Sequence, residues 1–251
     1  MRLRVLNSGS KANGYVLYND VEALVIECGV PYSQCLRALD FKREKIVGAI
    51  VSHAHGDHCK YVAQYINAGM AVFASKGAIE EMKPYLAKGG ALFQPKEAVS
   101  QSVFLLGGFT IMPFDTQHDC ADPLGFLIYH EEMGQAVFAT DTYYLKYKFE
   151  NLCHVMIECN YDTGIIERNV IDNVIPAIVK DRVTRSHMSL DTTIATLRAN
   201  DLSKVNAIVL LHLSSHNSDA DWFKRAVEGA TGKLVFIAKK GLDIPFNKEL
   251  L

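Results

Sequence analysis

The stretch His53-Ala54-His55-Gly56-Asp57-His58 places four side chains of metal-binding type within six residues. It directly follows the apolar run Gly48-Ala49-Ile50-Val51-Ser52, which is typical of a buried strand. Alternate side chains of an extended segment point the same way, so the first two histidines can hold one ion while the aspartate and the third histidine reach a second. The alternative is a polar loop that is merely rich in histidine, but crowding these groups together is costly without a metal ion. The stretch therefore predicts a metal site.

Composition limits the class of protein. The 251 residues are 49% hydrophobic and 22% charged, which is enough apolar content for one large core, so we expect a single domain over residues 1–251. The net charge of −2 gives no global attraction to nucleic acid or acidic membranes, although local basic patches remain open. The N-terminus turns polar at Asn7, too early for a signal peptide, and no apolar run approaches a membrane span. We expect a cytoplasmic protein with no membrane partner.

The six cysteines form no CxxC pair, and a disulfide framework would be unusual in a cytoplasmic chain of this size. Cys59 and Cys120 each lie close in sequence to a candidate metal ligand. A soft thiolate could therefore join the site. The alternative, which we favour, is that both are small buried apolar residues.

Further candidate ligands stand where predicted strands end. Two strands are predicted within 103–114, separated by Gly107-Gly108, and single strands at 135–139 and 205–211; His118, Asp141 and His212 follow their ends. A further predicted strand at 155–158 ends in the acid Glu158. Helical spacing is predicted at 31–39, 61–68, 76–88, 165–179, 190–200 and 219–229. Ligand sites in α/β sheets gather at the carboxyl ends of strands. Two sheets packed face to face, with helices outside, would bring these ends together along one edge.

Two segments near the N-terminus allow two interpretations each. Residues 7–14 form a turn-rich cluster, either a hairpin turn or a loop that contacts a phosphate or braces the metal loop. Glu27 ends a predicted strand at 23–29. It either orients a metal-bound histidine or is a strand-end carboxylate in water, and we favour the second.

Taken together, these residues resemble the metallo-β-lactamase superfamily, over nearly the whole chain. The resemblance implies an α/β fold, a four-layer αβ/βα sandwich of two packed mixed sheets with helices outside and a metal site at one edge. Matching the superfamily's motif position by position implies seven ligands to two divalent ions: His53, His55 and His118 on one, Asp57, His58 and His212 on the other, and Asp141 between them.

Within the superfamily, the chain is most similar to the small bacterial WalJ-like (YycJ-like) branch, which is associated with DNA exonuclease activity. Four short stretches carry this likeness: Ser8-Gly9-Ser10-Lys11-Ala12-Asn13, His118-Asp119 with Pro123-Leu124-Gly125-Phe126, His187-Met188-Ser189, and His212-Leu213-Ser214 with Asn217. They imply substrate contacts at Ser8, Ser10, Asn13 and Asn217. The chain departs from the branch at Cys59-Lys60-Tyr61 and at Tyr143-Tyr144, which leaves the shape of the substrate open.

The implied function is a phosphodiesterase acting on nucleic acid, DNA rather than RNA, with a metal-bridging hydroxide as nucleophile. Histidines and carboxylates suit zinc, and manganese or iron would also accept them. Asp57 and His187 are the candidate catalytic residues. His187 lies just before a predicted helix, where it could contact the scissile phosphate or protonate the leaving oxygen. The alternative is a helix-capping or solvent-facing histidine.

The same residues fit two other functions. The same metal centre could hydrolyse a small thioester or lactone, and a non-catalytic metal-bearing scaffold could simply bind a partner. Nucleic acid would have to be held by the compact body, and its candidate basic residues can equally be solvated surface charge. These residues are Lys42, Arg43, Lys45, Lys146, Lys148, Lys180, Arg182 and Arg185.

Overall fold

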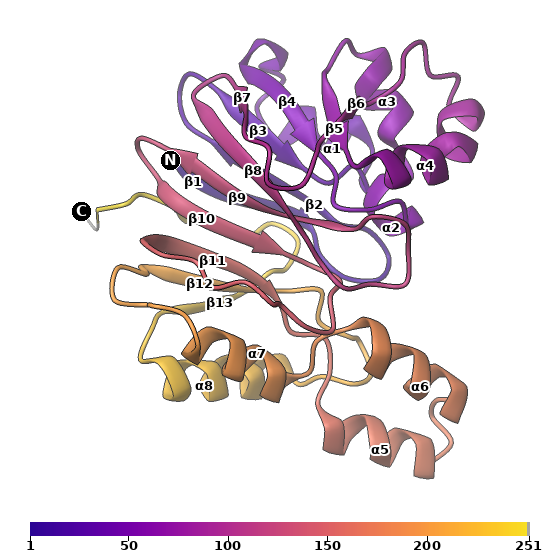
Figure 1. Ribbon diagram of the computed structural model, residues 1–251, viewed down its shortest axis with the longest axis vertical. Helices are drawn as coiled ribbons and strands as arrows, with labels where there is room; N and C mark the ends of the chain where they lie inside the picture. The colour runs from indigo at the N-terminus through magenta and orange to yellow at the C-terminus, as the bar shows by residue number, and fades with distance from the viewer. Residues whose placement is uncertain (250–251) are drawn as a thin grey trace.

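The computed structural model of the protein describes residues 1–249 and contains two seven-stranded mixed sheets packed face to face (Figure 1). The first sheet has the order β14-β1-β2-β3-β4-β5-β6 and the second the order β13-β12-β11-β10-β9-β8-β7. The first is built from β1 (Arg2–Asn7), β2 (Gly14–Tyr18), β3 (Ala23–Ile26), β4 (Ile46–Ile50), β5 (Val72–Ala74), β6 (Lys96–Glu97) and β14 (Asp243–Pro245). The second is built from β7 (Phe104–Leu106), β8 (Phe109–Asp115), β9 (Leu124–His130), β10 (Gly134–Ala139), β11 (Leu152–Glu158), β12 (Ala207–Leu211) and β13 (Val235–Ile237).

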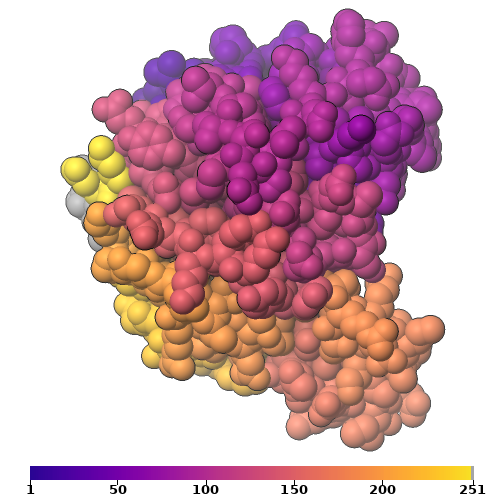
Figure 2. Space-filling model, viewed as in Figure 1, coloured from indigo at the N-terminus to yellow at the C-terminus, as the bar shows by residue number. Residues whose placement is uncertain are grey.

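Helices cover the outer faces of both sheets. On the first sheet lie α1 (Tyr32–Ala38), α3 (Val62–Asn67) and α4 (Lys76–Lys88), and the short helices η1 (Arg43–Lys45) and α2 (Gly56–Cys59) flank β4. On the second lie α7 (Leu190–Arg198) and α8 (Ala220–Thr231). The remaining helices, α5 (Thr163–Ile171) and α6 (Ala177–Ser186), pack on each other and project from the body (Figures 1 and 2). The expected four-layer arrangement is confirmed.

Alternation along the central strands explains the layers. In β10, Ala136 and Phe138 face the core between the sheets, whereas Val137 and Ala139 face the helices. Strands buried on both faces read as continuous apolar runs rather than alternating ones. This is why the sequence signals buried strands at β4, β10 and β12 so clearly.

The prediction of one helical stretch over 165–179 was wrong. The structure has two helices, separated by residues 172–176, and the second continues to Ser186. Asn173 takes a left-handed conformation with φ 57°, and Pro176 caps the start of α6. Proline lacks a backbone N–H and disfavours a helical conformation in the residue before it, so the chain breaks and restarts there.

No helix within residues 1–249 has both the length and the apolar character that crossing a membrane requires.

His154, near the start of β11, predicts a loss of stability in acid. The residue is 1% exposed, its Nε2 lies 3.2 Å from the carbonyl oxygen of Asn247, and its ring stacks on Phe246. Burial lowers the pKa of His154 to about 4. Between this value and the ordinary pKa of about 6.5, the unfolded chain binds a proton that the folded protein excludes, so stability falls as the pH falls.

We expect this residue alone to remove about 1.6 kcal/mol of the free energy of unfolding between pH 6.5 and 5. Urea unfolding of the wild type and of His154→Gln across this range measures the difference, because glutamine keeps an N–H donor but does not titrate. Equal pH slopes in the two proteins would contradict the prediction.

Candidate metal centre

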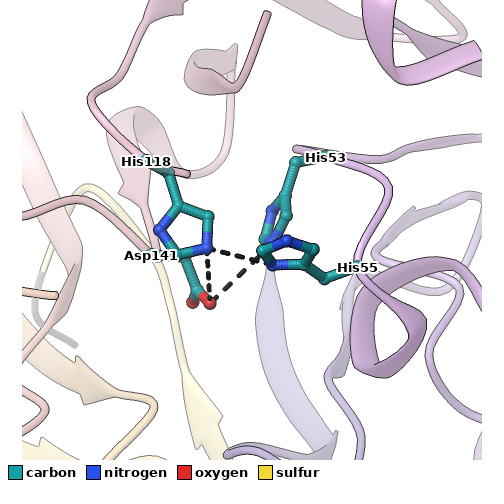
Figure 3. A group of neighbouring side chains, drawn as sticks. All are labelled: His53, His55, His118 and Asp141. Atoms are coloured by element: carbon teal, nitrogen blue, oxygen red, sulfur yellow. Dashed lines mark hydrogen bonds and ion pairs between the residues drawn. The ribbon is translucent and has the colours of Figure 1, made fainter. Parts of the chain in front are cut away.

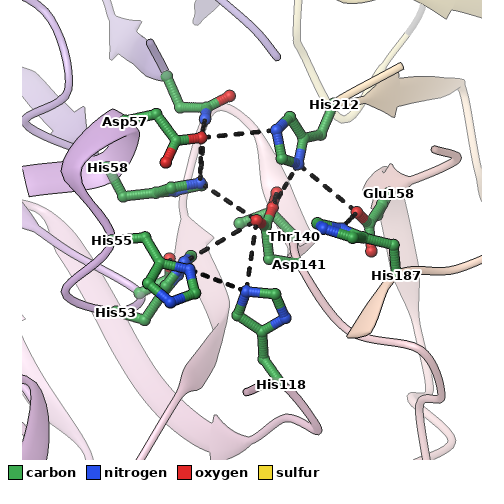
Figure 4. Close-up of polar contacts among 12 residues, drawn as sticks. His53, His55, Asp57, His58, His118, Thr140, Asp141, Glu158, His187 and His212 are labelled. Atoms are coloured by element: carbon green, nitrogen blue, oxygen red, sulfur yellow. Dashed lines mark hydrogen bonds and ion pairs between the residues drawn. The ribbon is translucent and has the colours of Figure 1, made fainter. Parts of the chain in front are cut away.

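The candidate ligands gather at one edge of the two sheets, where β4, β8, β10 and β12 end (Figure 4). His53 and His55 lie in the extended segment after β4, and His55 is the N-cap of α2 with φ −61° and ψ 145°. The chain then turns into α2, which carries Asp57 and His58 in its first turn. One extended segment followed by one helical turn therefore divides the motif between two clusters. The surface is hollowed at this edge, between the half that carries α4 and the projecting α5 and α6 (Figure 2).

The first cluster consists of His53, His55, His118 and Asp141, whose ligand atoms all lie within 4.8 Å of one another (Figure 3). Nε2 of His118 lies 3.1 Å from Nδ1 of His55 and 3.7 Å from Oδ2 of Asp141. Nε2 of His53 lies 3.8 Å from the same carboxylate oxygen. Three imidazole nitrogens and one carboxylate oxygen thus converge on a space suited to one cation.

The second cluster consists of Asp57, His58, Asp141 and His212. Nε2 of His58 lies 3.3 Å from Oδ2 of Asp57 and 3.4 Å from Oδ2 of Asp141. Nε2 of His212 lies 3.5 Å from Oδ2 of Asp57. Asp141 belongs to both clusters, so its carboxylate is placed to bridge two ions.

The donor atoms fit a metal ion. Nδ1 of His118 lies 2.8 Å from the carbonyl oxygen of Ser186, which can only accept a hydrogen bond, so Nδ1 carries the proton and the lone pair of Nε2 faces the cluster. Burial lowers the pKa of His118 and lowers that of His53 well below its ordinary value, which keeps both imidazoles neutral, as metal ligation requires. Among residues 1–249, Nε2 of His53 and Nε2 of His212 are buried without a hydrogen-bond partner. Such atoms are costly unless something binds them.

The charge of the site also favours cations. Burial acts to lower the pKa of His212, but the carboxylates of Asp141 and Glu158 outweigh it and raise that pKa to about 10. A field that holds a proton on a buried imidazole also attracts a divalent ion in its place, and metal binding would release the proton.

The N-terminal loop of residues 7–14 holds candidate ligands in place through hydrogen bonds. Asn13 is fully buried, and its Nδ2 donates to Oδ2 of Asp57 at 3.1 Å and lies 2.9 Å from Nε2 of His58. The hydroxyl of Ser8 accepts a hydrogen bond from the backbone N–H of His212, which has φ 53°. A left-handed conformation is uncommon for histidine, and such conformations persist where the surroundings enforce them.

Two other predicted substrate contacts have different surroundings. Ser10 is exposed, whereas Asn217 is buried and its Oδ1 accepts a hydrogen bond from Nδ2 of Asn169. Ser8 and Asn13 touch metal-centre residues directly. Contact of any of the four with a substrate stays a prediction.

Glu27 corrects a sequence interpretation. We favoured a strand-end carboxylate in water, but Glu27 is fully buried, and its Oε1 lies 3.5 Å from Nδ1 of His58. Its carboxylate also accepts the backbone N–H of Ser52. The nearby Gly29 allows the motif loop to approach this closely, because a Cβ there would lie 1.7 Å from the carbonyl oxygen of Asp57. Glu27 therefore orients a ligand of the second cluster from behind.

A third group extends the site beyond the seven expected ligands. Asp141 and His212 lie together with Glu158 and His187. Glu158 is fully buried at the end of β11, and its Oε1 lies 2.6 Å from Nδ1 of His187. Its Oε2 accepts the backbone N–H groups of Thr142 and Met188. The sequence marked Glu158 only as another strand-end acid and gave no signal of its pairing with His187.

This pairing fixes the orientation of His187. Its ring centroid lies 5.2 Å from that of His118 and 5.4 Å from that of His212, and its side chain is 13% exposed. Burial acts to lower the pKa of His187, but the Glu158 carboxylate raises it above its ordinary value. Nδ1 is engaged by Glu158, so Nε2 is the nitrogen left to meet a substrate at the metal centre.

The remaining histidines and the two nearby cysteines lie outside these clusters. Cys59 is buried, and its thiol donates to the carbonyl oxygen of Ala54. Burial raises the pKa of Cys120 to about 12, which disfavours a thiolate. Nε2 of His130 lies 3.1 Å from Oε1 of Glu22, and His216 is exposed.

Comparison with known proteins agrees with the fold. The family model described as the beta-lactamase superfamily domain matches residues 24–213. No curated protein matches the chain.

Among solved structures, the metallo-beta-lactamase fold protein YhfI from Bacillus subtilis is 18% identical, with a TM-score of 0.74 over 97% of this chain and 98% of that protein. A diphosphatase from the PhnP family is 14% identical, with a TM-score of 0.69 over 98% of each chain. The short form of human tRNase Z is 14% identical, with a TM-score of 0.65 over 98% of this chain and 99% of that one. At these identities the likeness shows the shared fold.

Proposed function

Because the chain belongs to the metallo-β-lactamase superfamily, we propose that it is a phosphodiesterase that uses two divalent metal ions and cleaves nucleic acid. The observation that carries this proposal is the Glu158–His187 pair beside the two clusters. Cleavage of a phosphodiester in nucleic acid releases an alkoxide, which departs far more easily when an acid protonates it. Hydrolysis of a thioester releases a thiolate, which has little need of such an acid.

The residues divide the work between them. Seven side chains would hold two ions: His53, His55, His118, Asp57, His58, His212 and the shared Asp141. Ions bound there would supply a water of lowered pKa and would stabilise negative charge on the phosphate. Glu158 holds His187 by Nδ1, so that Nε2–H can protonate the leaving oxygen. We propose zinc for this donor set, with manganese and iron as alternatives.

The choice of substrate has two supports. Two structurally similar proteins are a diphosphatase and a tRNase Z, so this fold serves phosphorus chemistry in both. The short stretches that resemble the WalJ-like branch favour DNA over RNA. A cytoplasmic location would be consistent with that substrate.

Cleavage of end-labelled single- and double-stranded DNA and RNA by protein reconstituted with zinc or manganese tests the proposal. We expect metal-dependent cleavage that disappears in Asp57→Ala, because Asp57 supplies a carboxylate to the second cluster. A thioester and a lactone are assayed in parallel. Hydrolysis of either without cleavage of any polymer would replace the proposal with a small-molecule hydrolase. A fully metallated protein that is inert toward all of them would indicate a scaffold.

A further inference from the structure

We propose that the loop of residues 142–148 and helix α7 form a groove that binds the single-stranded end of a nucleic acid next to the metal centre. This inference builds on the proposed function and names the form of its substrate. It starts from Tyr143-Tyr144, where the sequence departs from the branch that it resembles.

The route of the loop places it beside the site. Strands β10 and β11 are parallel neighbours, so residues 140–151 must return from the metal-centre edge to the opposite edge of the sheet. Parallel strands are usually joined through a helix, but this connection contains none. At its start, the backbone N–H of Thr142 donates to Glu158 at 2.8 Å. The loop therefore leads directly away from the catalytic pair.

Alternation along the loop creates an outward-facing row. Leu145 and Phe149 are buried in the core between the second sheet and its covering helices, whereas Tyr144, Lys146 and Lys148 are exposed. Alternate residues of an extended segment point to opposite sides. One aromatic ring and two ammonium groups thus follow one another, beginning three residues from Asp141.

A groove accompanies this row. It has a volume of about 490 Å³ and lies between the loop and α7. Its lining includes Tyr144, Lys146 and Lys148 from the loop, Thr192 and Thr196 from the helix, and Asn200 just beyond the helix end. Helix α7 begins three residues after His187, so both walls of the groove start at the proposed active site.

The chemistry of the walls suits an unpaired strand. Tyr144 is 50% exposed, and an aromatic face stacks on any base, which strengthens binding by roughly 5- to 150-fold per base. Bases inside a duplex have no free face to offer. Lysines bind phosphates as point charges. Asp191 is the one acid among the lining residues, and Asp115 lies 3.5 Å from Nζ of Lys146, so Lys148 is the better phosphate contact.

Binding rather than cleavage tests this groove. Fluorescence anisotropy of phosphorothioate-linked oligothymidine and oligouridine on the metal-loaded protein compares DNA with RNA, and a matching duplex is the third probe. We expect Tyr144→Ala to weaken single-strand binding by about 10-fold and Tyr144→Phe to restore it, because phenylalanine keeps the ring. We expect Lys148→Ala to reduce the salt slope by about 1.

Tyr129 provides the matched control, because it is 47% exposed on β9 and lies outside the groove. We expect Tyr129→Ala to bind single strands as the wild type does. The proposal is wrong if Tyr144→Ala also binds single strands as the wild type does, or if it loses duplex binding as strongly as single-strand binding. Either result contradicts the groove even if the protein cleaves polymers. If the wild type cleaves no polymer but binds single strands through Tyr144, the groove stands and the nuclease proposal fails.

Discussion

Replacement of Asp141 by asparagine is expected to remove metal binding and hydrolysis together. Asp141 is 2% exposed, and its Oδ2 lies 3.4 Å from Nε2 of His58 and 3.7 Å from Nε2 of His118, so one carboxylate serves both clusters. Asparagine keeps the shape but not the charge. Mutation of residues that only orient a metal ligand already costs roughly 10- to 100-fold. We therefore expect metal affinity and turnover to fall by more than about 100-fold.

Metal content and thermal unfolding measure this effect without reference to a substrate. A ligand that binds only the folded state at 100 times its dissociation constant stabilises that state by about 2.7 kcal/mol. We expect the wild type to show such a metal-dependent increase in stability and Asp141→Asn to show none. Asp201→Asn, in an exposed turn, is the control and should behave as the wild type does. An Asp141→Asn protein that still binds two ions would show that the bridging assignment is wrong.

The sequence predicted that the candidate ligands lie close together because local spacing and strand ends both carry the signal. Residues 53–58 place two donors before a helical turn and two within it, a division that depends on local conformation alone. His118, Asp141 and His212 each follow a buried strand, and buried apolar runs are the clearest pattern in the chain. Because those strand ends share one edge, their order in the sequence was enough to predict that they meet.

What the sequence could not show depends on contacts between distant segments. Glu27 was interpreted as solvent-exposed, yet the approach of His58 and Ser52 buries it. Asn13 was predicted as a substrate contact, and its contact with Asp57, 44 residues away, had no signal in the sequence. A single polar residue at a strand end or in a turn has the same local pattern whether water or another segment faces it.

Substitution of His187 by glutamine is expected to slow cleavage of nucleic acid by about 100- to 10,000-fold, the usual contribution of a general acid. Its Nδ1 lies 2.6 Å from Oε1 of Glu158, so Nε2–H is the proton available to the leaving oxygen. Glutamine can still donate a hydrogen bond but cannot transfer a proton. Glu158 and His187 are not among the seven proposed metal ligands, but both lie next to Asp141 and His212. Metal content is therefore measured with every rate.

Two substrates with different leaving groups can distinguish a proton donor from a residue that only maintains the structure of the site. A nitrophenyl phosphodiester releases a phenolate that departs without being protonated, so His187→Gln should hydrolyse this ester at a rate close to that of the wild type. The positioning role of Glu158 predicts the same selective loss in Glu158→Gln, but smaller, because His187 keeps its proton and loses only its orientation. A structural defect would instead slow both substrates equally. Equal losses of rate on both substrates at full metal content would therefore show that His187 is not the proton donor. A loss of rate confined to nucleic acid would show that His187 protonates the departing oxygen.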